Sequence, residues 1–140
     1  MGGAPRRAAT VTVALDSWAI LAWIDGDDPA TDLVNGALES PDPVVISWIN
    51  LAEVHYKLSR RSSPARASEM TAALEDVLVA ELPTRAIVLG AADLKAAHPI
   101  AFADCFAVAT AAKLGLELWT GDPEIIDRRS ALPCAVRDLR

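Results

Sequence analysis

Short runs of β-branched and other apolar residues alternate along this chain with longer segments of helical periodicity. No hairpin signal such as Asn-Gly joins two of the short runs. Strands that follow one another without hairpins pair in parallel, through right-handed crossovers that contain helices. The alternation therefore predicts an α/β protein, a three-layer α/β/α sandwich around a central, mainly parallel sheet of four to five short strands.

The expected strands are short apolar runs bounded by turn residues. They cover residues 11–15, 44–47, 79–82, 116–120 and, as an edge strand, 135–139. Helices are expected between them, at residues 17–24, 29–38, 48–60, 63–78, 85–98 and 103–115. Capping residues mark several of the helix starts, including Asp28 before Pro29, Ser63 before Pro64, and Thr84.

Length and composition limit the class of protein. A chain of 140 residues, 52% hydrophobic, is long enough for one domain with a substantial core. We expect residues 1–9 to be a flexible tail and residues 10–140 to form a single domain. No apolar run approaches the roughly 18 residues that span a bilayer, and no signal peptide is recognisable. Two cysteines make no disulfide framework, so we expect a cytoplasmic protein with no membrane partner.

Four acidic residues stand where chemistry is placed in an open α/β sheet. Asp16 directly follows the first strand, and Asp122 follows the strand at 116–120. Glu53 lies about two turns into the helix after the second strand, and Asp104 is in the first turn of the helix that leads into the strand at 116–120. Since the carboxyl ends of parallel strands meet at one edge, we expect the four carboxylates to converge there.

Converging carboxylates repel one another unless a divalent cation offsets their charge. Oxygen ligands without histidine or cysteine suit Mg²⁺ or Mn²⁺ rather than zinc. A cation in such a site orients a water, lowers its pKa and stabilises charge on a phosphate, so no side-chain nucleophile is needed. The net charge of −6 argues against a broad basic nucleic-acid surface but not against binding through a bridging cation.

Each acid also has a purely structural explanation. Asp16, Asp104 and Asp122 stand at or beside predicted helix starts, where aspartate caps free backbone N–H groups. Glu53 can pair with Lys57 four residues later on a solvated helix face. The hydroxyls of Ser17 and Thr120 can hold a carboxylate or a water, although they are also common turn and cap groups.

The motifs that carry these acids resemble those of PIN-domain proteins, and more narrowly of the VapC toxins of bacterial toxin–antitoxin pairs. The resemblance covers nearly the whole chain and rests on four segments. They are Ala-Leu-Asp-Ser at 14–17, Asn-Leu-Ala-Glu-Val at 50–54, Phe-Ala-Asp-Cys-Phe-Ala-Val-Ala-Thr-Ala at 102–111 and Leu-Trp-Thr-Gly-Asp at 118–122. Trp119 and Pro123 depart from the usual pattern.

The resemblance implies a Mg²⁺-dependent endoribonuclease with a PIN-like fold, held inactive by a cognate antitoxin protein and commonly a homodimer. The acids that match are Asp16, Glu53, Asp104 and Asp122. In this hypothesis Asp16, Asp104 and Asp122 bind the metal, while Glu53 binds it directly or positions the attacking water. The RNA substrate would be contacted by local cations, for which the candidates are Lys57, Arg60, Arg61 and Arg66.

The alternative hypothesis is a catalytically inactive PIN-like module that binds a partner protein, its acids being caps and surface charges. A haloacid-dehalogenase-like phosphatase fits poorly, because Trp18 occupies the place of the second acid in the required Asp-x-Asp. A receiver domain also needs paired acids that the chain lacks. The tryptophans Trp18, Trp23 and Trp48 lie in apolar helical runs, which favours burial in the core or in an interface.

Overall fold

The computed structural model describes residues 12–140, and these form an α/β structure in which strands and helices alternate. The strands are β1 (Val13–Leu15), β2 (Val44–Ser47), β3 (Val79–Glu81), β4 (Glu117–Thr120) and β5 (Val136–Asp138). The helices are α1 (Ser17–Asp25), α2 (Ala30–Glu39), α3 (Trp48–Arg61), α4 (Pro64–Val77), α5 (Arg85–Ala97), α6 (Phe102–Leu114) and α7 (Pro123–Ile126), with a 3₁₀ turn at Arg129–Ala131. The expected tail at residues 1–9 lies outside the described residues.

All five strands belong to one sheet, in the order β3-β2-β1-β4-β5, and every neighbouring pair is parallel. The predicted fold class, a parallel α/β sandwich with a late edge strand, is therefore confirmed. In the register of the sheet Leu15 is aligned with Ile46 on β2 and with Trp119 on β4. Asp16 consequently leaves β1 at the same level at which Ser47 ends β2 and Thr120 ends β4.

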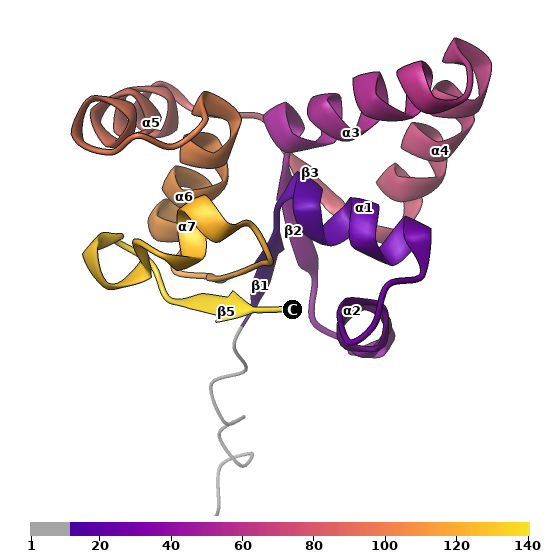
Figure 1. Cartoon of the computed structure of the whole chain (residues 1–140), viewed down its shortest axis with the longest axis horizontal. Coiled ribbons are helices and arrows are strands. Elements are labelled where there is room, and N and C mark those ends of the chain that lie inside the picture. The colour runs from indigo at the N-terminus through magenta and orange to yellow at the C-terminus, as the bar shows by residue number, and fades with distance from the viewer. Residues whose placement is uncertain (1–11) are drawn as a thin grey trace, which may run out of the picture.

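Helices cover both faces of the sheet, as Figure 1 shows with α5, α6 and α7 on one side of β1 and β2 and α1 and α2 on the other. Alternate strand residues face the two layers, as the two-residue period of a strand requires. Leu15 and Ile46 belong to the core cluster formed with α1 to α4, whereas Ala14, Val45 and Leu118 pack in the cluster that contains α6. The two layers thus bury both faces of these short central strands.

Helix starts follow the predicted caps in most places. The side chains of Ser63 and Thr84 accept hydrogen bonds from backbone N–H groups at the starts of α4 and α5. The expectation for α2 is wrong: the helix begins at Ala30, and Pro29 is its N-cap without any side-chain cap, so Asp28 does not cap it. No helix among residues 12–140 is long and apolar enough to cross a membrane.

The turn between α6 and β4 depends on the backbone of Gly115. Its φ of 66° lies in the left-handed region, and its N–H bonds to carbonyls of the last turn of α6. We expect Gly115→Ala to lower the free energy of unfolding by about 1–2 kcal/mol, because a Cβ is strained at this φ. Urea denaturation measures the change.

Gly36→Ala is the matched control, because Gly36 lies inside α2 and a Cβ there would meet no atom within 4 Å. This variant should gain roughly 0.5–1 kcal/mol of stability, since alanine loses less conformational entropy than glycine in a helix. Equal effects of the two substitutions would contradict the assignment of the turn.

Candidate functional site

The predicted acids lie around one cleft of about 660 Å³ at the carboxyl end of the sheet. Glu53, Asp104 and Asp122 line it directly. Asp16 lies beneath it and is fully buried. The parallel register brings the ends of β1 and β4 to this level, while α3 and α6 each deliver one acid from the first or second turn.

Asp16 is held on both oxygens of its side chain. Its Oδ1 accepts the N–H of Ala19 at 2.9 Å, which makes it the N-cap of α1, and its Oδ2 accepts the hydroxyl of Thr120. Burial raises the pKa of the Asp16 carboxyl to about 7, although both hydrogen bonds oppose the shift. The charges of Asp122 and Glu53 raise it further. The capping explanation of Asp16 is thus correct, but it does not account for the cost of this burial.

Asp104 is buried in the first turn of α6 and is not a cap, because the N-cap is Ala101. Burial raises the pKa of Asp104 to about 8, and the nearby charges of Asp122 and Asp16 add to the effect. A hydrogen bond with Asp122 also favours the protonated form of Asp104. The structural explanation weighed for this residue therefore fails.

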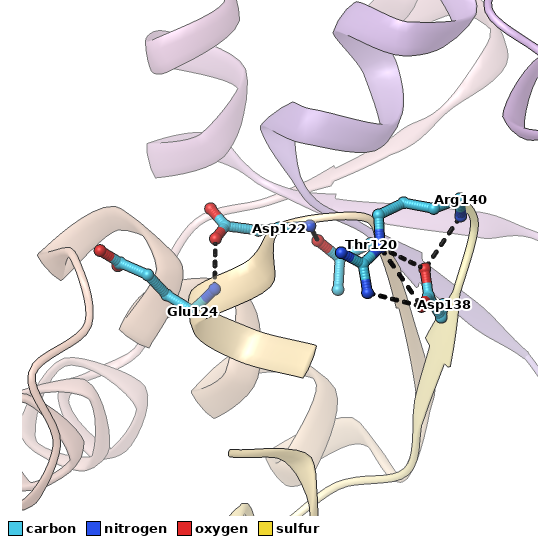
Figure 2. A network of polar contacts seen from close by, with 5 residues as sticks. All are labelled: Thr120, Asp122, Glu124, Asp138 and Arg140. Carbon is cyan, nitrogen blue, oxygen red and sulfur yellow. Dashed lines mark hydrogen bonds and ion pairs between the residues drawn. The ribbon is translucent and has the colours of Figure 1, made fainter. Parts of the chain in front are cut away.

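Asp122 and Glu124 stand together at the start of α7. Figure 2 shows Asp122 between Thr120 and Glu124: its N–H donates to Thr120 Oγ1, and its Oδ1 accepts the N–H of Glu124, each at 2.9 Å. Asp138 and Arg140 form a separate ion pair beyond Thr120. Pro123 is the first residue of the helix, a position that proline favours, so it fixes Asp122 as the cap.

Carboxylate oxygens of Asp104, Asp122 and Glu124 lie within 4.8 Å of one another. Among residues 12–140 this is the group of acids that could hold a metal ion, and Asp16 and Glu53 are outside it. The sequence prediction missed Glu124, which is exposed and reads as an ordinary acid in a first helical turn. The signal that could have found it is its place two residues after Asp122.

Glu53 approaches the cleft from α3 with its side chain 17% exposed. It accepts the hydroxyl of Ser17, and its Oε2 lies 3.6 Å from Lys57 Nζ. The predicted i,i+4 pair with Lys57 therefore exists, yet Glu53 also faces the other acids. One turn earlier Asn50 is buried, with its Nδ2 bonded to the carbonyl of Ala103 and its Oδ1 without a partner.

The donor set fits a hard divalent cation. Ligand oxygens about 2.1 Å from Mg²⁺ lie at most about 4.2 Å apart, close to the spread of the three carboxylates. The residues that could hold the ion are Asp104, Asp122 and Glu124. Two cationic side chains reach the same cleft, Lys57 beside Glu53 and Arg61, whose guanidinium pairs with Asp25 at 3.2 Å.

Comparison with known proteins gives a family and a fold. A family model described as the PIN domain matches residues 13–131 of the chain. A search of curated proteins finds no match. The chain is similar in structure to VapBC2 from Rickettsia felis, solved with a DNA fragment, at a TM-score of 0.73 and 15% identity over 92% of this chain and 99% of that one.

Two further solved structures show the same likeness. VapBC-1 from nontypeable Haemophilus influenzae has a TM-score of 0.72 and 20% identity, over 91% of this chain and 98% of that one. VapC20 from Mycobacterium tuberculosis, described as a toxin that cleaves the sarcin–ricin loop, has a TM-score of 0.69 and 21% identity, over 83% and 94%. These TM-scores show a shared fold, and at identities below 25% the comparison shows the fold alone.

The raised pKa values predict how stability depends on pH when no divalent cation is present. The folded protein holds the protons of Asp16 and Asp104 up to about pH 7 and 8, whereas the unfolded chain loses them near pH 3.8. The folded state therefore binds more protons between these values, and in EDTA the free energy of unfolding should fall as pH rises from about 4 to 8 and level off above pH 8. Each group contributes at most about 1.4 kcal/mol per pH unit.

Asp104→Asn should flatten this fall and make the metal-free protein more stable than wild type at pH 8.5. The substitution removes a buried acid that caps no helix, so its effect reports the ionisation of this carboxyl and its contact with Asp122. Asp93→Asn, at an exposed position on α5, is the matched control and should follow the wild-type curve. Thermal unfolding across pH measures all three, and a wild-type curve that is flat or rising would contradict the expectation.

Proposed function

The chain belongs to the PIN-domain family, and we propose that it is a divalent-cation-dependent endoribonuclease that acts as the toxin of a toxin–antitoxin pair. One observation supports this proposal more strongly than any other. Carboxylates from two separate elements, Asp104 in the first turn of α6 and Asp122 and Glu124 at the start of α7, have oxygens within 4.8 Å of one another in one cleft. Such a site suits the hydrolysis of a phosphodiester.

The proposed ligands of Mg²⁺ or Mn²⁺ are Asp104, Asp122 and Asp16, to which the structure adds Glu124. Both oxygens of Asp16 accept hydrogen bonds, but each carboxylate oxygen has a second lone pair. A cation bound here supplies a Lewis acid that stabilises charge on a phosphate and lowers the pKa of water. It would also offset the repulsion among the acids, which adds to the effect of burial on the pKa values of Asp16 and Asp104.

Glu53 is proposed to orient the attacking water rather than to join the group around Asp104. Its Oε1 is fixed by the hydroxyl of Ser17 and its Oε2 by Lys57, so the carboxylate enters the reaction already oriented. A water that donates a hydrogen bond to Glu53 can present its lone pair to the phosphorus. Attack forms one P–O bond and breaks another, and the water's proton passes to the leaving oxygen.

Substrate binding in this proposal relies on the cations of α3. Lys57 and Arg61 line the cleft beside the acids, where Arg61 can exchange Asp25 for a phosphate of RNA and Lys57 can contact a phosphate while it stays beside Glu53. Arg60 lies 4.9 Å above the ring of Tyr56 on the exposed surface of the same helix. Phosphate contacts of this kind supply affinity without base specificity, so they do not select a particular RNA sequence.

The proposed partners follow from the family resemblance and the fold comparisons. A similar structure from Klebsiella pneumoniae is described as a toxin–antitoxin complex, and we extend a cognate antitoxin, a homodimer and a cytoplasmic location to this chain as proposals. The gene upstream tests the toxin assignment. A short reading frame whose product binds this protein and suppresses its nuclease activity supports it.

The inactive interaction module remains a second candidate because the structure gives three of the acids a structural partner. Asp16 and Asp122 are helix caps, and Glu53 pairs with Lys57. Calorimetric titration with Mn²⁺ separates the two functions. Saturable binding that Asp104→Asn weakens favours the nuclease, and the absence of saturable binding favours the module.

Removing either buried carboxylate should abolish RNA cleavage. We expect Asp16→Asn and Asp104→Asn to reduce metal-dependent cleavage of single-stranded RNA by at least about 100-fold, because each neutralises a proposed ligand while asparagine keeps the shape. The rate is measured with protein purified from a nuclease-deficient host. Asp93→Asn is the control for a lost surface charge.

Circular dichroism must show that the variants are folded for this comparison to count. If Asp16→Asn or Asp104→Asn cleaves RNA as fast as wild type, the residue that it replaces is not needed for catalysis. Cleavage by wild type that persists unchanged in excess EDTA would contradict the dependence on a cation.

Glu124→Gln tests the ligand that the sequence prediction missed. We expect the Mn²⁺ dissociation constant to rise roughly tenfold, less than for Asp104→Asn, because an exposed carboxylate contributes less than a buried one. The amide still accepts the N–H of Ala101, so the local structure is kept. Glu75→Gln, exposed on α4, is the matched control, and equal affinities for the two glutamine variants would exclude Glu124 from the site.

A further inference from the structure

Gly121 is a buried residue between Thr120 and Asp122. A glycine is needed here because of a close neighbour and not because of an unusual backbone conformation. Of the glycines in the described part of the chain, Gly26 and Gly115 are the ones with positive φ. Gly121 therefore has a conformation that other residues can adopt. A Cβ built on it would nevertheless collide with three ring atoms of Trp18, namely Cη2, Cζ2 and Cζ3, each closer than 3.0 Å.

The backbone of Trp18 is held close to Gly121 by the start of α1. Trp18 is the second residue of α1, two positions after Asp16, and the cap on Asp16 fixes that end of the helix. Its indole is partly buried against the main core cluster and also lines the cleft of the acids. The far end of the indole therefore lies against Gly121, while the backbone of Trp18 is held by the start of α1.

The loop after β4 is consequently attached to the end of β1 and the start of α1 at two successive residues. Thr120 donates its hydroxyl to Asp16, and its Oγ1 accepts the N–H of Asp122. Gly121, between them, packs directly under the ring of Trp18. These contacts fix the position from which the side chain of Asp122 extends toward Asp104 and Glu124.

We infer that Trp18 and Gly121 are positioning residues that set the place of Asp122 through the close contact of indole and glycine. Neither residue touches the reacting atoms. A methyl group on Gly121 must push away either the ring or the loop, and the loop carries Asp122 directly. The contact thereby couples the acid after β1 with the acid after β4, which are separated by more than one hundred residues in sequence.

A double-mutant cycle tests this inference through the variants Gly121→Ala, Trp18→Phe and the two combined. Phenylalanine keeps an aromatic ring but lacks the far end of the indole that fills the space above Gly121. Mn²⁺ affinity by calorimetry, with the metal alone as probe, is the first readout. The second is kcat and KM for RNA cleavage, which rests on the proposed function.

Gly121→Ala should weaken Mn²⁺ binding and lower kcat by at least tenfold each, with KM for RNA changed by less than threefold. Trp18→Phe alone should change both quantities by less than threefold, and adding it to Gly121→Ala should restore both to within about threefold of Trp18→Phe alone. Gly90→Ala is the control, because a Cβ there would lie at an ordinary 3.8 Å from Ala109 Cβ. It should behave as wild type in both measurements.

Three results would overturn the inference. In the first, Gly121→Ala has the Mn²⁺ affinity and kcat of wild type; in the second, the double variant is no better than Gly121→Ala in these quantities. In the third, Gly121→Ala fails to fold. In the last case the contact governs folding rather than the place of Asp122. Failure of the proposed function gives a different result, because wild-type protein would then show neither Mn²⁺ binding nor RNA cleavage.

Discussion

Burial of like charges at the carboxyl edge of a parallel sheet is the constraint on which this structure depends. Asp16 is wholly buried and Asp104 nearly so, with Asp122 and Glu53 close enough to raise their pKa values. Neighbouring buried carboxyl groups do not stabilise a fold, because burial and mutual repulsion both disfavour their charged forms. The cost of this arrangement is offset by backbone N–H groups, by the hydroxyls of Thr120 and Ser17, and, in the proposed function, by a divalent cation.

Much of the fold and part of the site could be predicted from the sequence because the controlling signals are local. Short apolar runs without hairpin turns implied parallel strands, and parallel strands bring Asp16 and Asp122 to one edge whatever the details of packing. Asp104 could be placed because its helix leads directly into β4. The expectation that the four acids converge rests on that topology.

The rest of the site depends on contacts that no spacing rule describes. Glu124 joins Asp104 and Asp122 because α7 begins immediately after Asp122, whereas in the sequence it is one more acid near a proline. Trp18 was expected in a core or an interface. It packs half-buried against the main core cluster, and its ring also lies on Gly121, which is more than one hundred residues away in the sequence. The missing cap at Asp28 shows the same limit, since residue type alone does not fix the path of the chain.

Whether the converging acids form a cation site can be seen in an anomalous difference map from crystals grown with Mn²⁺. We expect a peak in the cleft, with oxygens of Asp104 and Asp122 at about 2.1 Å from it. The same map from Asp104→Asn crystals should lose the peak. Wild-type crystals at saturating Mn²⁺ with no peak among these carboxylates would contradict the presence of a cation site.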